Sequence, residues 1–154
     1  MRGRTLAALV CFLAATIVLA QGSKPAQSKP VVWPAADMKW IDMQPGPPGV
    51  KIVDLWGDHA KGAYGALIKF PAGFAAPLHT HANDMKIVVV SGTFLHGAPG
   101  ETDVRLGPGS YFLQPGGSYK HTTGCDKASD CVIFAESKGA FTLTMADGTA
   151  APKK

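Results

Sequence analysis

Three histidines carry most of the chemistry that this sequence offers. His79 and His81 are two residues apart, and His121 follows a turn rich in Gly and Pro further along the chain. In an extended segment side chains alternate between the two faces, so the imidazoles of His79 and His81 point to the same side of a sheet. A third imidazole from a neighbouring strand would complete a set of three nitrogen ligands. Because neutral imidazole binds many transition metals, the pattern predicts one divalent transition-metal ion, without distinguishing Fe, Mn, Zn, Ni and Cu.

Residues 1–20 have the composition of a secretory signal peptide. Arg2 and Arg4 precede the uncharged apolar run 6–20, which is shorter than the roughly 20 residues that cross a bilayer. Small residues end the run before Gln21, as at a cleavage site. We expect a periplasmic or secreted protein with no stable membrane span after cleavage; an uncleaved anchor is the alternative.

Positive charge gathers at the two ends of the chain. The net charge is +4 at pH 7, and basic residues outside the first twenty include Lys24, Lys29, Lys153 and Lys154 in the tails. A nucleic-acid surface needs clustered Lys and Arg on the folded domain. The sequence therefore predicts a small-molecule ligand and no nucleic-acid partner.

Two cysteines remain once the predicted signal peptide, which contains Cys11, is removed. Cys125 and Cys131 flank a polar turn, and in an oxidising compartment such a pair forms a disulfide. Metal binding by the pair is the alternative, but no second Cys or His pair lies nearby. The disulfide would fix the loop that follows His121.

The chain between its ends is predicted to be one all-β domain. Residues 21–36 are polar and Pro-rich and indicate a flexible linker, 37–148 form the domain, and 149–154 are a tail. Short runs rich in Val, Ile, Phe, Tyr and Thr alternate with Gly/Pro turns, which is typical of a β-sandwich or barrel. The predicted strands are Met38–Met43, Lys51–Trp56, Tyr64–Phe70, Ala75–His81, Met85–Ser91, Thr93–His96, Thr102–Leu106, Ser110–Gln114, Ser118–Thr122, Cys131–Glu136 and Phe141–Met145. Met85–Ser91 is almost entirely apolar, which indicates a strand buried on both faces.

The ordered pattern resembles the cupin superfamily. Its first motif runs Gly, five residues, His-x-His, three or four residues, Glu, six residues, Gly; Gly73, His79, His81 and Gly92 match it, with Met85 in the place of the Glu. The second motif runs Gly, five residues, Pro-x-Gly, two residues, His. It is matched by Gly109, Pro115 and Gly117.

In the second motif Lys120 occupies the place of the family's His, and His121 comes one residue later. A β-bulge after Pro115-Gly116-Gly117 would turn His121 inward. Without a bulge, Lys120 would point in and disfavour a cation.

The resemblance implies a single cupin domain, a jelly-roll-like antiparallel β-barrel with a metal inside its mouth. Met85 shares the parity of the two histidines, so we expect it to line the pocket as apolar filler; a thioether ligand to Cu(I) is the alternative. Phe112 and Tyr119 are expected to line the same pocket. His59 is expected in a surface turn, and His96 either exposed or satisfied in the core.

The function follows from the site and not from the fold. We expect an exported metal-binding cupin that acts as a small-molecule oxygenase or related metalloenzyme, although no general base is evident. A non-catalytic protein that binds metal or a small ligand is the alternative, and a metal-free structural barrel is the third possibility if Lys120 faces inward. Cupin relatives often pair through N-terminal strands, so we expect a homodimer through Met38–Met43.

Overall fold

The computed structural model describes residues 29–146. The predicted signal peptide, the first part of the predicted linker and the predicted tail 149–154 lie outside these residues. Internal contacts divide the chain into Met1–Val32 and Trp33–Lys154, and every described strand belongs to the second unit. None of the described residues lies in a helix long and apolar enough to cross a membrane.

The described elements are one 3-10 turn and short strands joined by turns. They are η1 Ala35–Asp37, β1 Ile41–Asp42, β2 Lys51–Gly57, β3 Tyr64–Phe70, β4 Ala75–Thr80, β5 Met85–Ser91, β6 Phe94–Gly97, β7 Val104–Leu106, β8 Tyr111–Gln114, β9 His121–Cys125, β10 Cys131–Ser137 and β11 Thr144–Met145.

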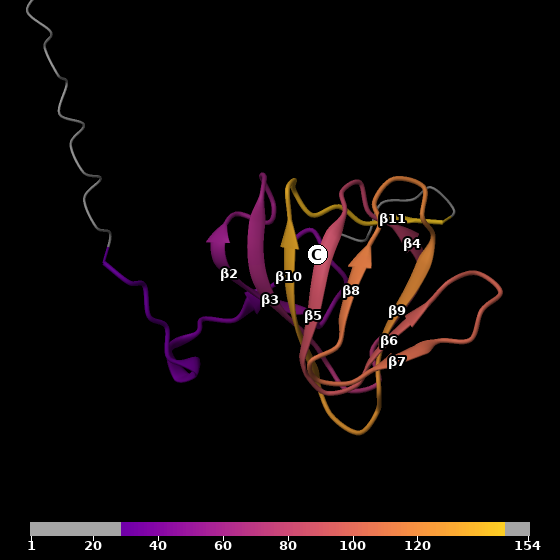
Figure 1. Cartoon of the computed structure of the whole chain (residues 1–154), viewed down its shortest axis with the longest axis horizontal. Helices are drawn as coiled ribbons and strands as arrows, with labels where there is room; N and C mark the ends of the chain where they lie inside the picture. Colours follow the sequence, from indigo (N-terminus) through magenta and orange to yellow (C-terminus); the bar gives the residue numbers. More distant parts are fainter. Residues whose placement is uncertain (1–28, 147–154) are drawn as a thin grey trace, which may run out of the picture. The chain divides into compact units, whose positions relative to one another are not determined.

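These strands form two antiparallel sheets, as the cupin resemblance implied. The six-stranded sheet has the order β1-β2-β3-β10-β5-β8, and the five-stranded sheet has the order β11-β4-β9-β6-β7 (Figure 1). The hydrophobic core draws Ile68, Ile87 and Ile133 from the first sheet and Phe94 and Cys125 from the second. The chain is therefore an all-β protein with the jelly-roll architecture of a cupin.

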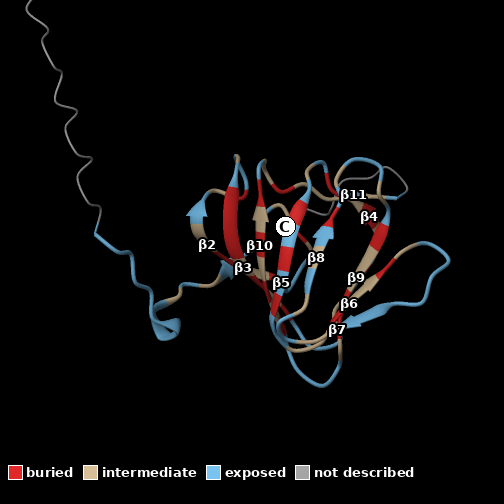
Figure 2. Ribbon diagram, viewed as in Figure 1, coloured by how far each residue is buried: buried red, intermediate tan, exposed pale blue. Residues whose placement is uncertain are grey.

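Strand β5 is buried on one face only, which corrects the expectation of two buried faces. Met85, Ile87 and Val89 are buried, whereas Lys86 and Val88 between them are exposed (Figure 2). An antiparallel sheet packs one face on the core and leaves the other accessible. Valines on the exposed face make the sequence of this strand almost entirely apolar, although that face is not buried.

Most of the predicted strands are present, but their ends differ from the predictions. Strand β11 keeps only the end of the predicted Phe141–Met145, and β1 keeps only the middle of Met38–Met43. Strand β9 begins at His121 and not at Ser118. Gly117 has a φ of 71°, a left-handed turn conformation that glycine adopts without strain, and the loop that contains it continues to Lys120.

Cys125 and Cys131 form the predicted disulfide. Cys125 ends β9 and Cys131 begins β10, so the bond joins the two sheets at the connection that follows His121. Both residues are buried.

His59 is buried, with only 5% of its surface exposed, which corrects the expectation of a surface turn. Its Nε2 donates to the Gln44 carbonyl oxygen at 3.1 Å, and its Nδ1 lies 2.8 Å from Oδ2 of Asp54. Its own carbonyl oxygen accepts from the Phe141 N–H at 2.7 Å. The residue is inside because the fold supplies a partner to both ring nitrogens.

Candidate metal centre

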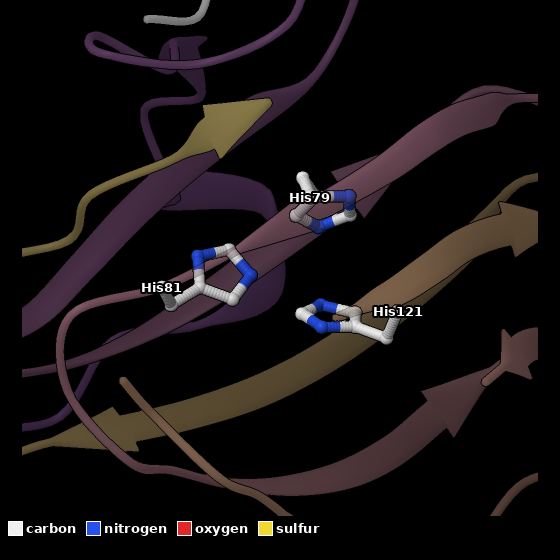
Figure 3. A group of neighbouring side chains, drawn as sticks. All are labelled: His79, His81 and His121. Atoms are coloured by element: carbon white, nitrogen blue, oxygen red, sulfur yellow. The ribbon is translucent and has the colours of Figure 1, made fainter. Parts of the chain in front are cut away.

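The structure brings the three predicted histidines together. His79, His81 and His121 are 1%, 6% and 0% exposed, and each offers a potential ligand atom within 4.8 Å of the others. Their imidazoles point toward a common space from β4, the residue just after β4, and the start of β9 (Figure 3). The ring centroids of His79 and His121 are 4.2 Å apart, and each lies 5.0 Å from that of His81.

A register shift in β4 places His79 opposite His121. Ala76 pairs with Thr123, but His79 pairs with His121, so β4 has one residue more than β9 between these two pairs. The irregularity lies at Pro77–Leu78 of β4, whereas the bulge that was expected to turn His121 inward lay after Pro115-Gly116-Gly117. Proline has no N–H to give to a ladder and is tolerated at bulges. Lys120 is exposed, which removes the reason for a metal-free barrel.

Backbone carbonyls fix the tautomers of two of the histidines. Nδ1 of His79 donates to the Pro77 carbonyl oxygen at 2.7 Å, and Nδ1 of His81 donates to the Thr142 carbonyl oxygen at 2.5 Å. A carbonyl oxygen only accepts, so both Nδ1 atoms carry the proton and both Nε2 atoms keep a free lone pair. Metal-binding histidines commonly have this arrangement.

His121 has a buried nitrogen that lacks a partner. Its Nε2 is buried and makes no hydrogen bond to any residue that the structure describes, while its Nδ1 lies 3.1 Å from the side-chain amide of Gln114 and 3.4 Å from the Tyr119 carbonyl oxygen. Buried polar atoms are nearly always paired. A metal ion between the three imidazoles would supply the missing partner, so the residues present fit the ion that the fold implies.

Burial keeps the three imidazoles neutral. Desolvation lowers the pKa of His79, lowers that of His81 to about 4 and lowers that of His121 to about 3. The neutral ring is the form that binds a metal. The set is therefore ready for a cation at neutral pH without losing protons first.

The histidines line a cavity that is mostly apolar. Met85 lines it as predicted, and the Tyr64 hydroxyl donates to the Met85 sulfur at 3.4 Å. Besides the imidazoles, the polar side chains in the lining are those of Gln114 and Thr123. The free space inside it is small, about 40 Å³, and the cavity is partly open to solvent.

Phe112 and Tyr119 are not among the residues that line the cavity, which differs from the prediction. The Tyr119 ring stacks on His121 with centroids 5.8 Å apart, and its hydroxyl lies 3.3 Å from Nε2 of His96. Phe112 packs against Phe94 and His96. His96 is thus partly buried in an aromatic cluster beside the site, and its Nδ1 has no hydrogen bond.

Sequence reasoning missed Gln114 and Thr142. Gln114 is 2% exposed and pairs in register with Met85; a single amide at an inward position of an apolar strand was the available signal. Thr142 is 61 residues from His81, and no local pattern connects them.

Asp54, Asp58 and His59 form a second group with metal-ligand spacing. In this group His59 already pairs with Asp54, and Asp58 already pairs with Lys61.

Comparison with solved structures supports the cupin assignment. The polyketide cyclase RemF from Streptomyces resistomycificus is 18% identical, with a TM-score of 0.65 over 82% of this chain and 90% of that one. An RmlC-like cupin from Ralstonia eutropha JMP134 is 20% identical, with a TM-score of 0.60 over 80% and 78%. The DMSP lyase DddQ from Ruegeria pomeroyi DSS-3 is 18% identical, with a TM-score of 0.57 over 75% and 64%. At these identities the likeness shows the fold alone.

The fold and its buried imidazoles thus define a protein with the cupin fold and a buried group of three histidines. Within that class, the family model described as "Domain of unknown function (DUF4437)" matches residues 13–144, and the chain belongs to that family. A comparison with curated proteins found no match.

Proposed function

We propose that this protein is a metal-dependent cupin enzyme in which His79, His81 and His121 hold one divalent transition-metal ion. The observation that carries the proposal is the convergence of three buried imidazoles, one of which has a buried Nε2 without a partner. Two of the three already have the Nδ1–H tautomer that leaves Nε2 free. Three neutral nitrogen ligands suit Zn, Cu, Fe and Ni.

The reaction class we favour is oxidation of a small organic molecule or a related metal-assisted reaction. A divalent ion held by neutral ligands supplies Lewis acidity and open coordination positions. The protein's own part is to exclude water with an apolar lining and to hold the imidazoles in place. Solved cupins of similar fold include a cyclase and a lyase, which supports an enzyme without indicating the substrate.

A non-catalytic binding protein is the second candidate. The described part of the lining contains no carboxylate, no lysine and no tyrosine, so these residues supply no proton-transfer group other than imidazole. General acid–base steps need such a group within hydrogen-bond reach of the reacting atom. This lining favours either chemistry confined to the ion or simple binding.

Metal analysis followed by oxygen uptake tests the proposal. Protein purified without a tag or chelator is compared with His121→Ala, and each is then supplied with Fe, Mn, Zn, Ni or Cu and a panel of small organic acids. We expect one ion per wild-type chain and substrate-dependent oxygen uptake with one of the metals. Equal metal content in the two proteins would remove the metal centre. Metal without turnover would favour the binding protein.

We also propose that the protein is exported to the periplasm or the medium. The sequence of residues 1–20 supports export, and the Cys125–Cys131 disulfide is typical of an oxidising compartment. The intact mass of protein isolated from the cell envelope or medium tests this. A mature chain that begins at Gln21 is expected, and a mass that retains residues 1–20 contradicts it.

A further inference from the structure

Among residues 29–146, those that line the metal cavity include no charged side chain. The polar ones are the three imidazoles, Gln114 and Thr123, and the others are apolar residues such as Phe70, Phe94 and Ile133. The charged residues closest in sequence to the site, Asp84 and Lys120, are exposed. A charged group of a bound molecule can therefore be balanced only by the ion.

The ion can balance the charge of a ligand only at the end of the cavity where the three imidazoles lie. Three neutral imidazoles leave a divalent ion with its full positive charge among apolar walls, where an unbalanced charge is costly. An anionic group of a ligand that reaches the ion relieves this cost. A second charge elsewhere on the same molecule would lie against Phe, Ile or Leu side chains without a partner.

We propose that the natural ligand of this cavity is a compact monoanion with an uncharged, mainly apolar body. Its anionic group lies at the imidazole end, near Gln114 and Thr123, and its body lies against Phe70, Phe94 and Ile133. The lining discriminates against dianions, zwitterions and cations. The free space inside the cavity is about 40 Å³ and the cavity is partly open to solvent, so we expect a short body, part of which extends toward the solvent. This inference rests on the proposed metal site.

Four rigid ligands that share one trans-alkene frame test this. Crotonate is the monoanion, crotonamide is its neutral counterpart and fumarate is the dianion; the trans geometry stops both fumarate carboxylates from reaching one ion. (E)-4-methylpent-2-enoate has the same number of non-hydrogen atoms as fumarate but a single charge, so it controls for size. Each is titrated into the full chain reconstituted with cobalt(II), with visible absorption and calorimetry as readouts.

Both monoanions should bind at least about tenfold more tightly than the other two ligands. Fumarate brings a second carboxylate that has no partner, and crotonamide leaves the charge of the ion unbalanced. Such an unpaired buried charge costs more than the 1.4 kcal/mol that a factor of ten represents. Metal-free protein should bind none of the four. Fumarate that binds as tightly as (E)-4-methylpent-2-enoate, or cobalt-loaded protein that binds neither monoanion, would overturn the inference and leave the metal site intact. A wild-type chain that takes up no more cobalt than His121→Ala would overturn both proposals.

Discussion

His79 and His121 are directly paired across β4 and β9, although an unbroken register from Ala76 and Thr123 would have paired His79 with Lys120. One extra residue at Pro77–Leu78 makes this difference. In an antiparallel pair, directly opposed side chains lie on the same face. Ala76 and Thr123 line the cavity, so an unbroken register would have turned Leu78 toward His121 and sent His79 and His81 outward. The extra residue therefore places two of the three imidazoles in the cavity.

Removing any one imidazole should lower metal content to a small fraction of the wild-type value. We expect this of His79→Ala, His81→Ala and His121→Ala, while the apolar core keeps each variant folded. Met85→Leu is the matched control: it should keep the metal and remain folded, although loss of the sulfur acceptor of the buried Tyr64 hydroxyl costs about 1–3 kcal/mol. Elemental analysis and circular dichroism provide the measurements. Metal loss in Met85→Leu would indicate a thioether ligand.

Moving the third histidine back by one residue should not restore the site. In His121→Leu combined with Lys120→His, the new imidazole occupies the exposed position of Lys120. Its metal content should equal that of His121→Leu alone. If the double variant recovers the wild-type metal content, the observed pairing of His79 with His121 is not the one that builds the site.

Gln114 should set the metal affinity through His121. An ion on Nε2 requires a proton on Nδ1, and the Gln114 amide oxygen can accept that proton once the amide is turned. Gln114→Leu should weaken cobalt binding by about tenfold, the lower end of the range for outer partners of ligating histidines. Gln114→Glu should bind at least as tightly as wild type. Competition titration against a chelator measures both; unchanged affinity in Gln114→Leu contradicts the role.

The metal-free protein should lose stability as the pH falls below about 6.5. The folded-state pKa is about 4 for His81 and about 3 for His121, against 6.5 for an ordinary imidazole. Between these values the unfolded chain binds protons that the folded chain does not, so acid favours unfolding; above 6.5 the two groups add no pH dependence. Urea denaturation of chelator-treated protein at pH 7 and at about pH 5 measures this. His121→Leu should show a shallower decline, and a level wild-type profile would contradict the prediction.

The expected homodimer would pair through the edge strand β1. This strand is only two residues long, and Ile41 within it is 57% exposed. An accessible sheet edge can accept a strand from another chain. Light scattering should give the mass of two chains, and Ile41→Asp should shift it toward one. A monomer mass across a wide concentration range would contradict the dimer.

The parts of the fold that the sequence predicted are those with local signals. Gly/Pro turns and apolar alternation marked most strands, and two-residue spacing put His79 and His81 on one face. The bulge at Pro77–Leu78 could not be located in this way, because it depends on which strand lies opposite. The burial of His59 depends on Gln44 and Asp54, which the fold alone brings to its ring.

The bond from His81 to the Thr142 carbonyl has a consequence for the order of events in synthesis. His79 and His81 are synthesised well before Thr142, whose carbonyl oxygen orients His81 and which lies near the end of the described residues. β11, which pairs Met145 with His79, comes later still. A nascent chain that does not yet contain these residues has the histidines but lacks the contacts that orient them. If the proposed site binds an ion, we therefore expect uptake only after Thr142 and Met145 have been added to the chain.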